Sequence, residues 1–255
     1  MISAIDTHCH IHYGTKEGLV YNDFAKMINV ENNFHSSYPE ILKKISESAH
    51  IGKVFASPFD GVLDCARTEQ ANEDTFKIVA KSDFLYQWVV VDPRNESTFV
   101  QAERMLKSDK CVGIKLHPVA HKYSLEEYGD KVFSFADSLS AIVQIHPEME
   151  ADYILPFANR YGGVRFIMAH LGGEAHICAV KNAKNGNVYV DTATKFSMKN
   201  QIIEYAVSQI GSERILFGTD TFSAASQRGR IEFSMIRDQD KENILYNNAK
   251  ELFGI

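Results

Sequence analysis

The sequence predicts a (β/α)8 barrel, in which eight parallel strands form a closed ring with helices around it. Short apolar runs rich in Val, Ile and Phe alternate along the chain with longer segments of helical spacing. The apolar runs are nearly continuous, which is typical of parallel strands that are buried on both faces. A length of 255 residues also suits one barrel of this class.

Eight strands are expected in chain order. They read SAID, KVFASP, LYQWVVVDP, CVGIKLHP, AIVQIHP, VRFIMAHLGG, NVYVDT and RILFGTD. The helical segments between and after them include YPEILKKISESA, NEDTFKIVAK, ESTFVQAERMLK, SLEEYGDKVFSFADSL, QIIEYAVSQI and KENILYNNAKELFG. A doubly wound open sheet is the alternative, but such a sheet usually has a glycine-rich phosphate-binding turn after its first strand. Here the first strand is followed by HCHIHYG, which favours the barrel.

The chain is expected to form a single domain over residues 1–255, because no low-complexity tract or long linker divides the repeating pattern. One connection, from about residue 13 to residue 37, is longer than the others. Its mixed sequence and its glycines Gly14 and Gly18 make it a candidate lid over the barrel mouth.

Composition and charge exclude several classes of protein. Hydrophobic residues make up 45% of the chain and charged residues 24%, as in globular proteins with a large core. A formal net charge of -6 offers no broad basic surface for nucleic acid or anionic lipid. We find no apolar run near the roughly 20 residues of a membrane span and no signal peptide, so we expect a cytoplasmic protein. The four cysteines form no CxxC pair, so neither disulfides nor a thiolate zinc site are expected.

The segment DTHCHIH, at the expected first strand, places Asp6, His8, His10 and His12 at alternate positions. Alternate side chains of a strand point to the same side, with Cα atoms about 6.6 Å apart. The imidazoles of His8 and His10 can therefore converge on one metal ion. Asp6, two residues deeper on the same face, is expected to anchor the pair as a hydrogen-bond acceptor. For His12 the sequence does not distinguish a position facing substrate from one facing solvent.

Polar residues recur where later strands are expected to end. They are Lys115 and His117 in GIKLHP, His146 in QIHPE, His170 in MAHLGG and Asp220 in LFGTD. In a (β/α)8 barrel the carboxyl ends of the strands surround one mouth, where active sites lie. These dispersed segments are therefore expected to meet in one pocket.

Taken together, these motifs resemble the amidohydrolase superfamily, and within it the amidohydrolase-related (amidohydrolase 2) group of metal-dependent hydrolases and decarboxylases. The resemblance runs in order from DTHCHIH through IHP, AHLGG and ERILFGTD to the closing ENILYNNAKELFG. It implies a TIM barrel that holds a divalent ion, zinc or alternatively manganese, at about one per chain. The implied ligands are His8, His10, His146 and Asp220, with His170 as a further ligand or as an acid/base. One departure is GTDTFSAAS, which lacks the proline-containing turn of many relatives.

This ligand set predicts hydrolysis of a small amide, lactone or ester by a metal-activated water. Asp220 is the expected proton acceptor, and His170 is expected to polarise the substrate carbonyl or stabilise the oxyanion. The alternative is non-oxidative decarboxylation of a small aromatic acid, in which the ion grips a substrate carboxylate or phenolate. A barrel that binds metal or ligand without turnover is disfavoured, because a buried ring of ligands is costly to keep.

Substrate binding is expected from cations at the mouth. We favour Lys115 as a cation for a substrate carboxylate, with His117 on the same inward face. In several branches of the superfamily a carboxylated lysine at this strand bridges two metals, which is the minor alternative for Lys115. Arg94 and Lys195 also lie near the expected mouth and can clamp an anionic small molecule, although a solvated charge is the commoner fate of such residues. The sequence leaves a homo-oligomer open.

Three other conspicuous residues are expected to have structural and not functional roles. His121 has no partner in the sequence and is expected at the surface. His176, six residues after His170, is expected on a helix and not as a ligand. Trp88, inside LYQWVVV, is expected in the core.

Overall fold

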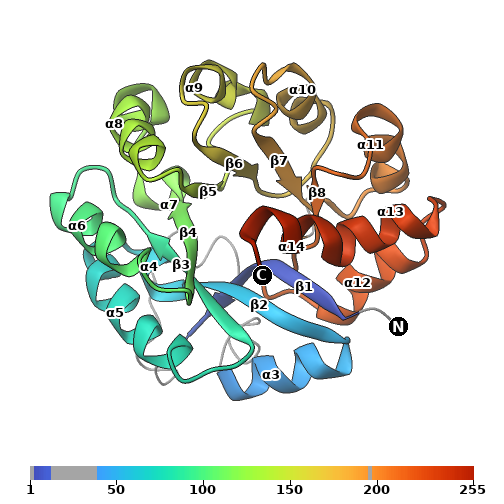
Figure 1. The fold of residues 1–255 in the computed structure, drawn as a ribbon, viewed down its shortest axis with the longest axis horizontal. Helices are drawn as coiled ribbons and strands as arrows, with labels where there is room; N and C mark the ends of the chain where they lie inside the picture. The colour runs from blue at the N-terminus through green and yellow to red at the C-terminus, as the bar shows by residue number, and fades with distance from the viewer. Residues whose placement is uncertain (1–2, 13–38, 195–196) are drawn as a thin grey trace.

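Eight parallel strands form one sheet in the order β1-β2-β3-β4-β5-β6-β7-β8, and helices surround it (Figure 1). The computed structural model describes residues 3–12, 39–194 and 197–255, so the candidate lid over residues 13–37 lies outside the described residues. The strands are β1 Ala4–Ile11, β2 Ile51–Pro58, β3 Leu85–Val90, β4 Cys111–Leu116, β5 Ile142–Ile145, β6 Arg165–Met168, β7 Val188–Asp191 and β8 Ile215–Leu216. Each contains or overlaps one expected segment, which confirms the predicted (β/α)8 barrel.

Helices follow the strands, most of them around the outside of the barrel, and the last one lies against the apolar end of its interior. They are α3 Pro39–Ser48, α4 Phe59–Leu63, α5 Thr68–Val79, α6 Glu96–Met105, α7 Pro118–His121, α8 Leu125–Ser138, α9 Leu155–Arg160, α10 Glu174–Asn182, α11 Ile202–Ile210, α12 Ala224–Glu232, α13 Asp238–Glu242 and α14 Asn248–Phe253. A π-helical turn, Asn243–Asn247, connects the last two. Local sequence fixes some starts, because Asn95 and Ser124 accept the N–H groups of Ser97 and Glu127 as caps of α6 and α8.

The barrel closes between its last and first strands through backbone hydrogen bonds. The N–H of Thr7 donates to the carbonyl of Phe217 at 2.9 Å, and that of Thr219 donates to the carbonyl of His8 at 3.1 Å. The segment after β8 therefore lies directly beside the histidine segment of β1.

Two register irregularities interrupt the pairing of β1 with β2, and the second lies within the histidine segment. Between Asp6 and Cys9 this strand takes three residues, whereas the paired stretch of β2, from Val54 to Ala56, takes two. Such a bulge changes which side chains share a face. Asp6 and the imidazoles that follow it are therefore not related by simple alternation.

Apolar side chains fill one end of the barrel interior. Trp88 is fully buried there, as predicted, and its ring and that of Phe55 pack against Phe253 with centroids 5.7 and 4.7 Å apart. The other apolar layer lies between the strands and the surrounding helices. The polar residues of the sequence motifs occupy the opposite end of the interior.

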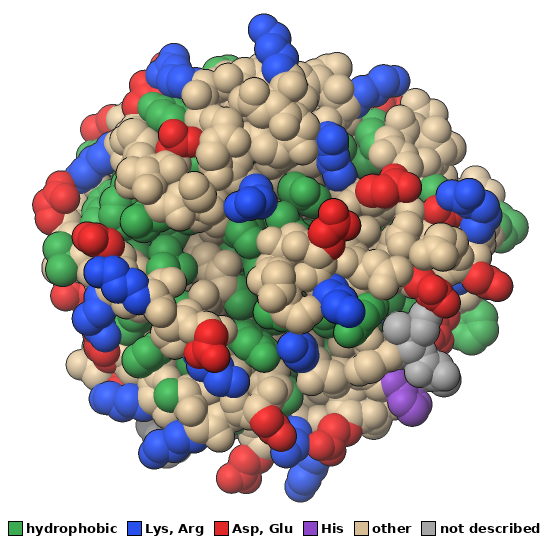
Figure 2. Space-filling model, in the orientation of Figure 1, with side chains coloured by type: hydrophobic (Ala, Val, Ile, Leu, Met, Phe, Trp, Pro, Cys, Tyr) green, Lys and Arg blue, Asp and Glu red, His purple; other side chains and the backbone are tan. Residues whose placement is uncertain are grey.

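On the face shown in Figure 2, Lys and Arg side chains are interspersed with Asp and Glu side chains. Among the helices of residues 3–12, 39–194 and 197–255, none has the length and apolar character needed to cross a bilayer.

Candidate metal centre at the barrel mouth

Three predicted ligands come together at the mouth. His8 and His10 of β1 direct Nε2 atoms toward Asp220, which follows β8, and these atoms lie 3.5 and 2.8 Å from Asp220 Oδ1. Their donor atoms all lie within 4.8 Å of one another. Two imidazoles and a carboxylate are a donor set that zinc and similar divalent ions bind.

The other ring nitrogen of each imidazole is held by a neighbouring side chain. His8 Nδ1 donates to Asp191 Oδ2 at 2.8 Å, so its Nε2 keeps a lone pair toward the mouth. His10 Nδ1 lies 2.8 Å from Ser57 Oγ, a hydroxyl that can donate or accept and so serves either tautomer. A proton shared by His10 Nε2 and Asp220 accounts for their short contact, and a divalent ion would take its place. The residues present therefore fit a metal ion.

Asp191, at the end of β7, is a residue of the candidate site that the sequence analysis missed. Its Oδ1 accepts the backbone N–H groups of His170 and Ala193, both at 3.0 Å, while Oδ2 binds His8. It forms a second group of close donor atoms with His8 and His170. The rule that polar residues at strand ends line the mouth applies to VYVDT as well, and could have identified it. The same rule applies to Ser57, near the end of β2 in KVFASP, which the sequence analysis also missed.

His146 and His170 lie together beside these groups. His146 Nδ1 and His170 Nε2 are 3.0 Å apart, and the ring of His117 stacks on that of His146 with centroids 4.0 Å apart. Among the described residues, two groups of three donor atoms meet the 4.8 Å limit, and His146 belongs to neither. Its expected role as a ligand stays a prediction.

Backbone conformation is strained at two of the predicted residues. His170 has φ 68° and Asp220 has φ 55°, a left-handed region that non-glycine residues seldom adopt. Such strain clusters at functional sites. The backbone just before Asp220 also passes very close to β1, because a Cβ added to Gly218 would lie 2.8 Å from the Cβ of His8. Only glycine lets the segment after β8 lie this close to β1.

Burial and charge set the ionisation of these groups. Burial opposes ionisation of Asp220, but the hydrogen bond with His10 and the charges of neighbouring histidines lower its pKa below the usual range. Burial lowers the pKa of His10 and of His170 to about 4, against the effect of Asp220. At neutral pH the site thus combines the ionised carboxylate of Asp220 with neutral imidazoles at His10 and His170, as metal binding requires.

Lys115 is buried at the centre of this arrangement. Its Nζ lies 3.1 Å from His8 Nε2 and donates to Gln144 Oε1 at 3.0 Å, and the residue is 0% exposed. Burial lowers the pKa of Lys115 to about 8, although Asp191 and Asp220 favour the charged form. A cation is therefore present within reach of the candidate metal ligands.

Three residues named in the sequence analysis remain to be placed, namely Arg94, Lys195 and His121. The guanidinium of Arg94 binds both oxygens of Asp92, at 2.9 and 2.8 Å, and donates to the carbonyl of His121. Lys195 lies outside the described residues. The prediction that His121 lies at the surface was wrong: it is 2% exposed, and its Nε2 hydrogen-bonds to the carbonyl of Gly61. The short helix α7, which the sequence did not indicate, turns it inward.

Two other residues of DTHCHIH are also buried. His12 pairs with Asp60 at 3.0 Å and does not face solvent. Asp6 anchors the segment through the backbone, because its Oδ1 accepts the N–H groups of His8 and Thr219. Asp6 thus anchors His8 as an acceptor, as expected, but through the backbone N–H, whereas the acceptor for the His8 ring is Asp191.

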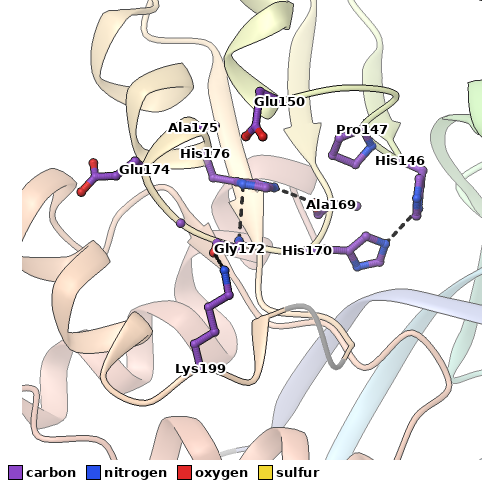
Figure 3. Close-up of a pocket in the computed structure, with 11 residues that line it drawn as sticks. His146, Pro147, Glu150, Ala169, His170, Gly172, Glu174, Ala175, His176 and Lys199 are labelled. Atoms are coloured by element: carbon purple, nitrogen blue, oxygen red, sulfur yellow. Dashed lines mark hydrogen bonds between the residues drawn. The ribbon is translucent and has the colours of Figure 1, made fainter.

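A pocket of about 650 Å³ opens beside His146 and His170, between the segments that follow β5 and β6 (Figure 3). Its lining comprises His146, Pro147, Glu150, Ala169, His170, Gly172, Gly173, Glu174, Ala175, His176 and Lys199. This volume lies within the usual range of small-molecule sites.

Comparison with known proteins gives two findings. The sequence matches the family described as amidohydrolase over residues 5–255. No curated protein matches the chain.

Solved structures share the fold over essentially the whole chain. A 5-carboxyvanillate decarboxylase from Sphingomonas paucimobilis has a TM-score of 0.75 at 14% identity, with 100% of both chains covered. A dihydroxybenzoic acid decarboxylase from Polaromonas, with bound manganese and the inhibitor 2-nitroresorcinol, has a TM-score of 0.72 at 17% identity, covering 100% of this chain and 97% of that one. A probable 2-pyrone-4,6-dicarboxylic acid hydrolase from Acinetobacter baumannii, with citric acid bound, has a TM-score of 0.69 at 17% identity and 100% coverage of both chains.

Proposed function

The chain belongs to the amidohydrolase family of enzymes, and from this premise we propose that it is a metal-dependent hydrolase of a small, anionic amide, lactone or ester. The observation that carries the proposal is the ionised carboxylate of Asp220 beside the imidazoles of His8 and His10. Hydrolysis needs a base that is already deprotonated, whereas protonation of a substrate carbon needs a proton donor. The carboxylate of Asp220, which faces the imidazoles of His8 and His10, is placed to act as that base.

We propose that His8, His10 and Asp220 hold one divalent ion, with His146 and His170 beside it as further ligands or as substrate contacts. Zinc is our first choice because of the imidazole-rich donor set, with manganese as the alternative. When bound, the ion supplies Lewis acidity, which lowers the pKa of a coordinated water and polarises a carbonyl. Asp220 takes the proton and returns it to the leaving group, and His170 steadies the oxygen of the substrate.

An anionic substrate is supported by the buried ammonium of Lys115. When His8 Nε2 binds an ion, its hydrogen bond with Lys115 Nζ is lost, and the ammonium can donate to a substrate carboxylate instead. We propose that the rest of the substrate extends into the 650 Å³ pocket past His146 and His170. Two metals bridged by a carboxylated Lys115 remain the minor alternative.

Decarboxylation is the second candidate. It is favoured by the likeness to two decarboxylases and by Lys115, because an ammonium and a metal ion together can hold the carboxylate of an aromatic acid. Under this alternative Asp220 would take a proton from solvent and pass it to the ring carbon, after which the bond to the carboxylate breaks and carbon dioxide leaves.

The experiment that tests the proposal starts from metal analysis of the purified protein. We expect about one zinc or manganese per chain. Protein stripped with chelator and reloaded with each metal is then assayed against lactones, amides and esters that carry a carboxylate, and against hydroxybenzoic acids. A new carboxylate product without carbon dioxide supports hydrolysis. Stoichiometric carbon dioxide would instead show that the protein is a decarboxylase. Full turnover by metal-free protein would overturn both.

A further inference from the structure

His176 lies near the start of α10 and outside both groups of candidate metal donors, yet it forms a wall of the pocket next to His170 (Figure 3). Its ring is half-buried and makes two hydrogen bonds. Nε2 lies 2.9 Å from the carbonyl oxygen of Ala169, and the N–H of Gly172 donates to Nδ1 at 3.3 Å. One imidazole therefore joins the peptide groups on either side of the His170-Leu171 turn.

These two bonds define the protonation of the ring. An N–H donor at Nδ1 requires a lone pair there, so the proton must sit on Nε2, where it meets the carbonyl of Ala169. Burial lowers the pKa of His176, which keeps the ring neutral. The neutral Nε2–H tautomer satisfies both contacts.

The turn that His176 holds is strained. His170 has φ 68°, and left-handed conformations of non-glycine residues persist only when the surroundings over-determine them. From the barrel side, the carboxylate of Asp191 accepts the N–H of His170. The backbone carbonyl of Asp191 accepts the N–H of Leu171 at 2.8 Å. From the helix side, His176 holds Ala169 and Gly172, and Lys199 donates to the carbonyl of Gly172.

We propose that His176 is a positioning residue that keeps His170 in its left-handed conformation and thereby aims His170 Nε2 at His146 and the candidate metal centre. The clamp acts through the backbone, so His176 needs no contact with substrate or metal. The consequence for turnover rests on the proposed function, whereas the clamp itself does not depend on it.

The test compares two variants. His176→Gln keeps an amide donor and acceptor at a spacing close to that of the two ring nitrogens, whereas His176→Phe keeps a flat ring without either. We expect His176→Phe to lower kcat on the order of tenfold to a hundredfold with little change in KM, because small misplacements of a reacting group cost this much. His176→Gln should recover most of the loss. The control is His50→Asn, at an exposed histidine whose left-handed backbone asparagine tolerates, and it should leave kcat unchanged.

A measurement without activity separates the clamp from the proposed function. Long-range 1H–15N NMR of the metal-free protein should show His176 as the Nε2–H tautomer. The His170 ring signals should move in His176→Phe and return in His176→Gln. A charged or Nδ1–H His176, or unchanged His170 signals in His176→Phe, would overturn the inference. If His176→Phe does not fold, the tautomer of the native ring and the His176→Gln variant still decide. Native protein without hydrolase activity but with these NMR results would refute only the proposed function.

Discussion

The two ends of the barrel interior are built by the same strands but from opposite chemistry. At one end, apolar side chains pack together, among them Ile5, Phe55, Trp88, Ile142 and Ile167. At the other, polar side chains are buried to a similar degree and bind one another, among them His8, Lys115, Gln144, His170 and Asp191. Burial alone therefore does not distinguish core from site, and what the buried groups contact does.

The difference has an energetic basis. Apolar contacts are non-directional and contribute in proportion to the area that they remove from water. Buried polar groups stabilise the fold only when each is hydrogen-bonded, and loss of one partner leaves the other unsatisfied. We therefore expect changes at the apolar end to reduce stability, and changes at the polar end to reduce metal binding and turnover.

The largest effect is expected for Trp88→Ala at the apolar end. It removes a fully buried ring and the hydrogen bond from Trp88 Nε1 to the carbonyl of Thr7. The free energy of unfolding should fall by about 3–5 kcal/mol, while kcat of the folded fraction stays near normal. Urea denaturation measures the first quantity. Val100→Ala, at a residue that is 69% exposed, is the control and should change stability little. A strong loss of kcat in folded Trp88→Ala would break the division between the two ends.

Asp220→Asn, at the polar end, should reduce turnover and metal binding instead of stability. It preserves size and one carbonyl oxygen but removes the charge and the base. Turnover should fall on the order of a hundredfold or more, while metal binding weakens without being lost, because the imidazoles of His8 and His10 still converge. Metal titration and steady-state kinetics check this pair of results. Near-normal turnover would contradict the assignment and leave His170 as the leading acid/base.

Gly218→Ala tests the close approach of the polar end to β1. Its new Cβ would lie 2.8 Å from the Cβ of His8, so the segment after β8 must shift. We expect a loss of about 1–3 kcal/mol in stability together with weaker metal binding. The matched control is Gly229→Ala in α12, where the nearest atom would be 3.8 Å away, and where alanine should be neutral or slightly stabilising. Equal behaviour of the two variants would show that the approach of β8 to β1 does not shape the site.

The smallest effect is expected for Lys115→Met. A thioether of similar length removes the ammonium without leaving a large cavity. KM for an anionic substrate should rise by about tenfold, equivalent to roughly 1.4 kcal/mol, with one metal per chain retained. A neutral substrate analogue is the control and should show no such rise. Loss of two metal equivalents per chain in this variant would instead support the carboxylated lysine.

Much of the fold was predictable because its determinants are local. Continuous apolar runs mark each strand from β1 to β8, and residues such as Asn95 and Ser124 mark helix starts. The pairing of His8 with His10 was predictable for the same reason, because alternate residues of one strand share a face over two positions. The helical position of His176 was also predicted and α10 confirms it, although the whole helix was harder to delimit because its sequence EAHICAVKN has weak amphipathic spacing.

The sequence by itself determined the kinds of residue at the mouth: the order of strands brings their carboxyl ends together, and the motif residues His8, His10, His146, His170 and Asp220 stand at those ends. Tertiary structure alone decided how they are supported. Asp6 accepts the backbone N–H of His8, whereas Asp191, 183 residues away in the sequence, accepts the hydrogen bond of the His8 ring. Periodicity specifies the face of a strand, but it cannot specify partners across the barrel, because those depend on register, backbone strain and the close approach of distant segments.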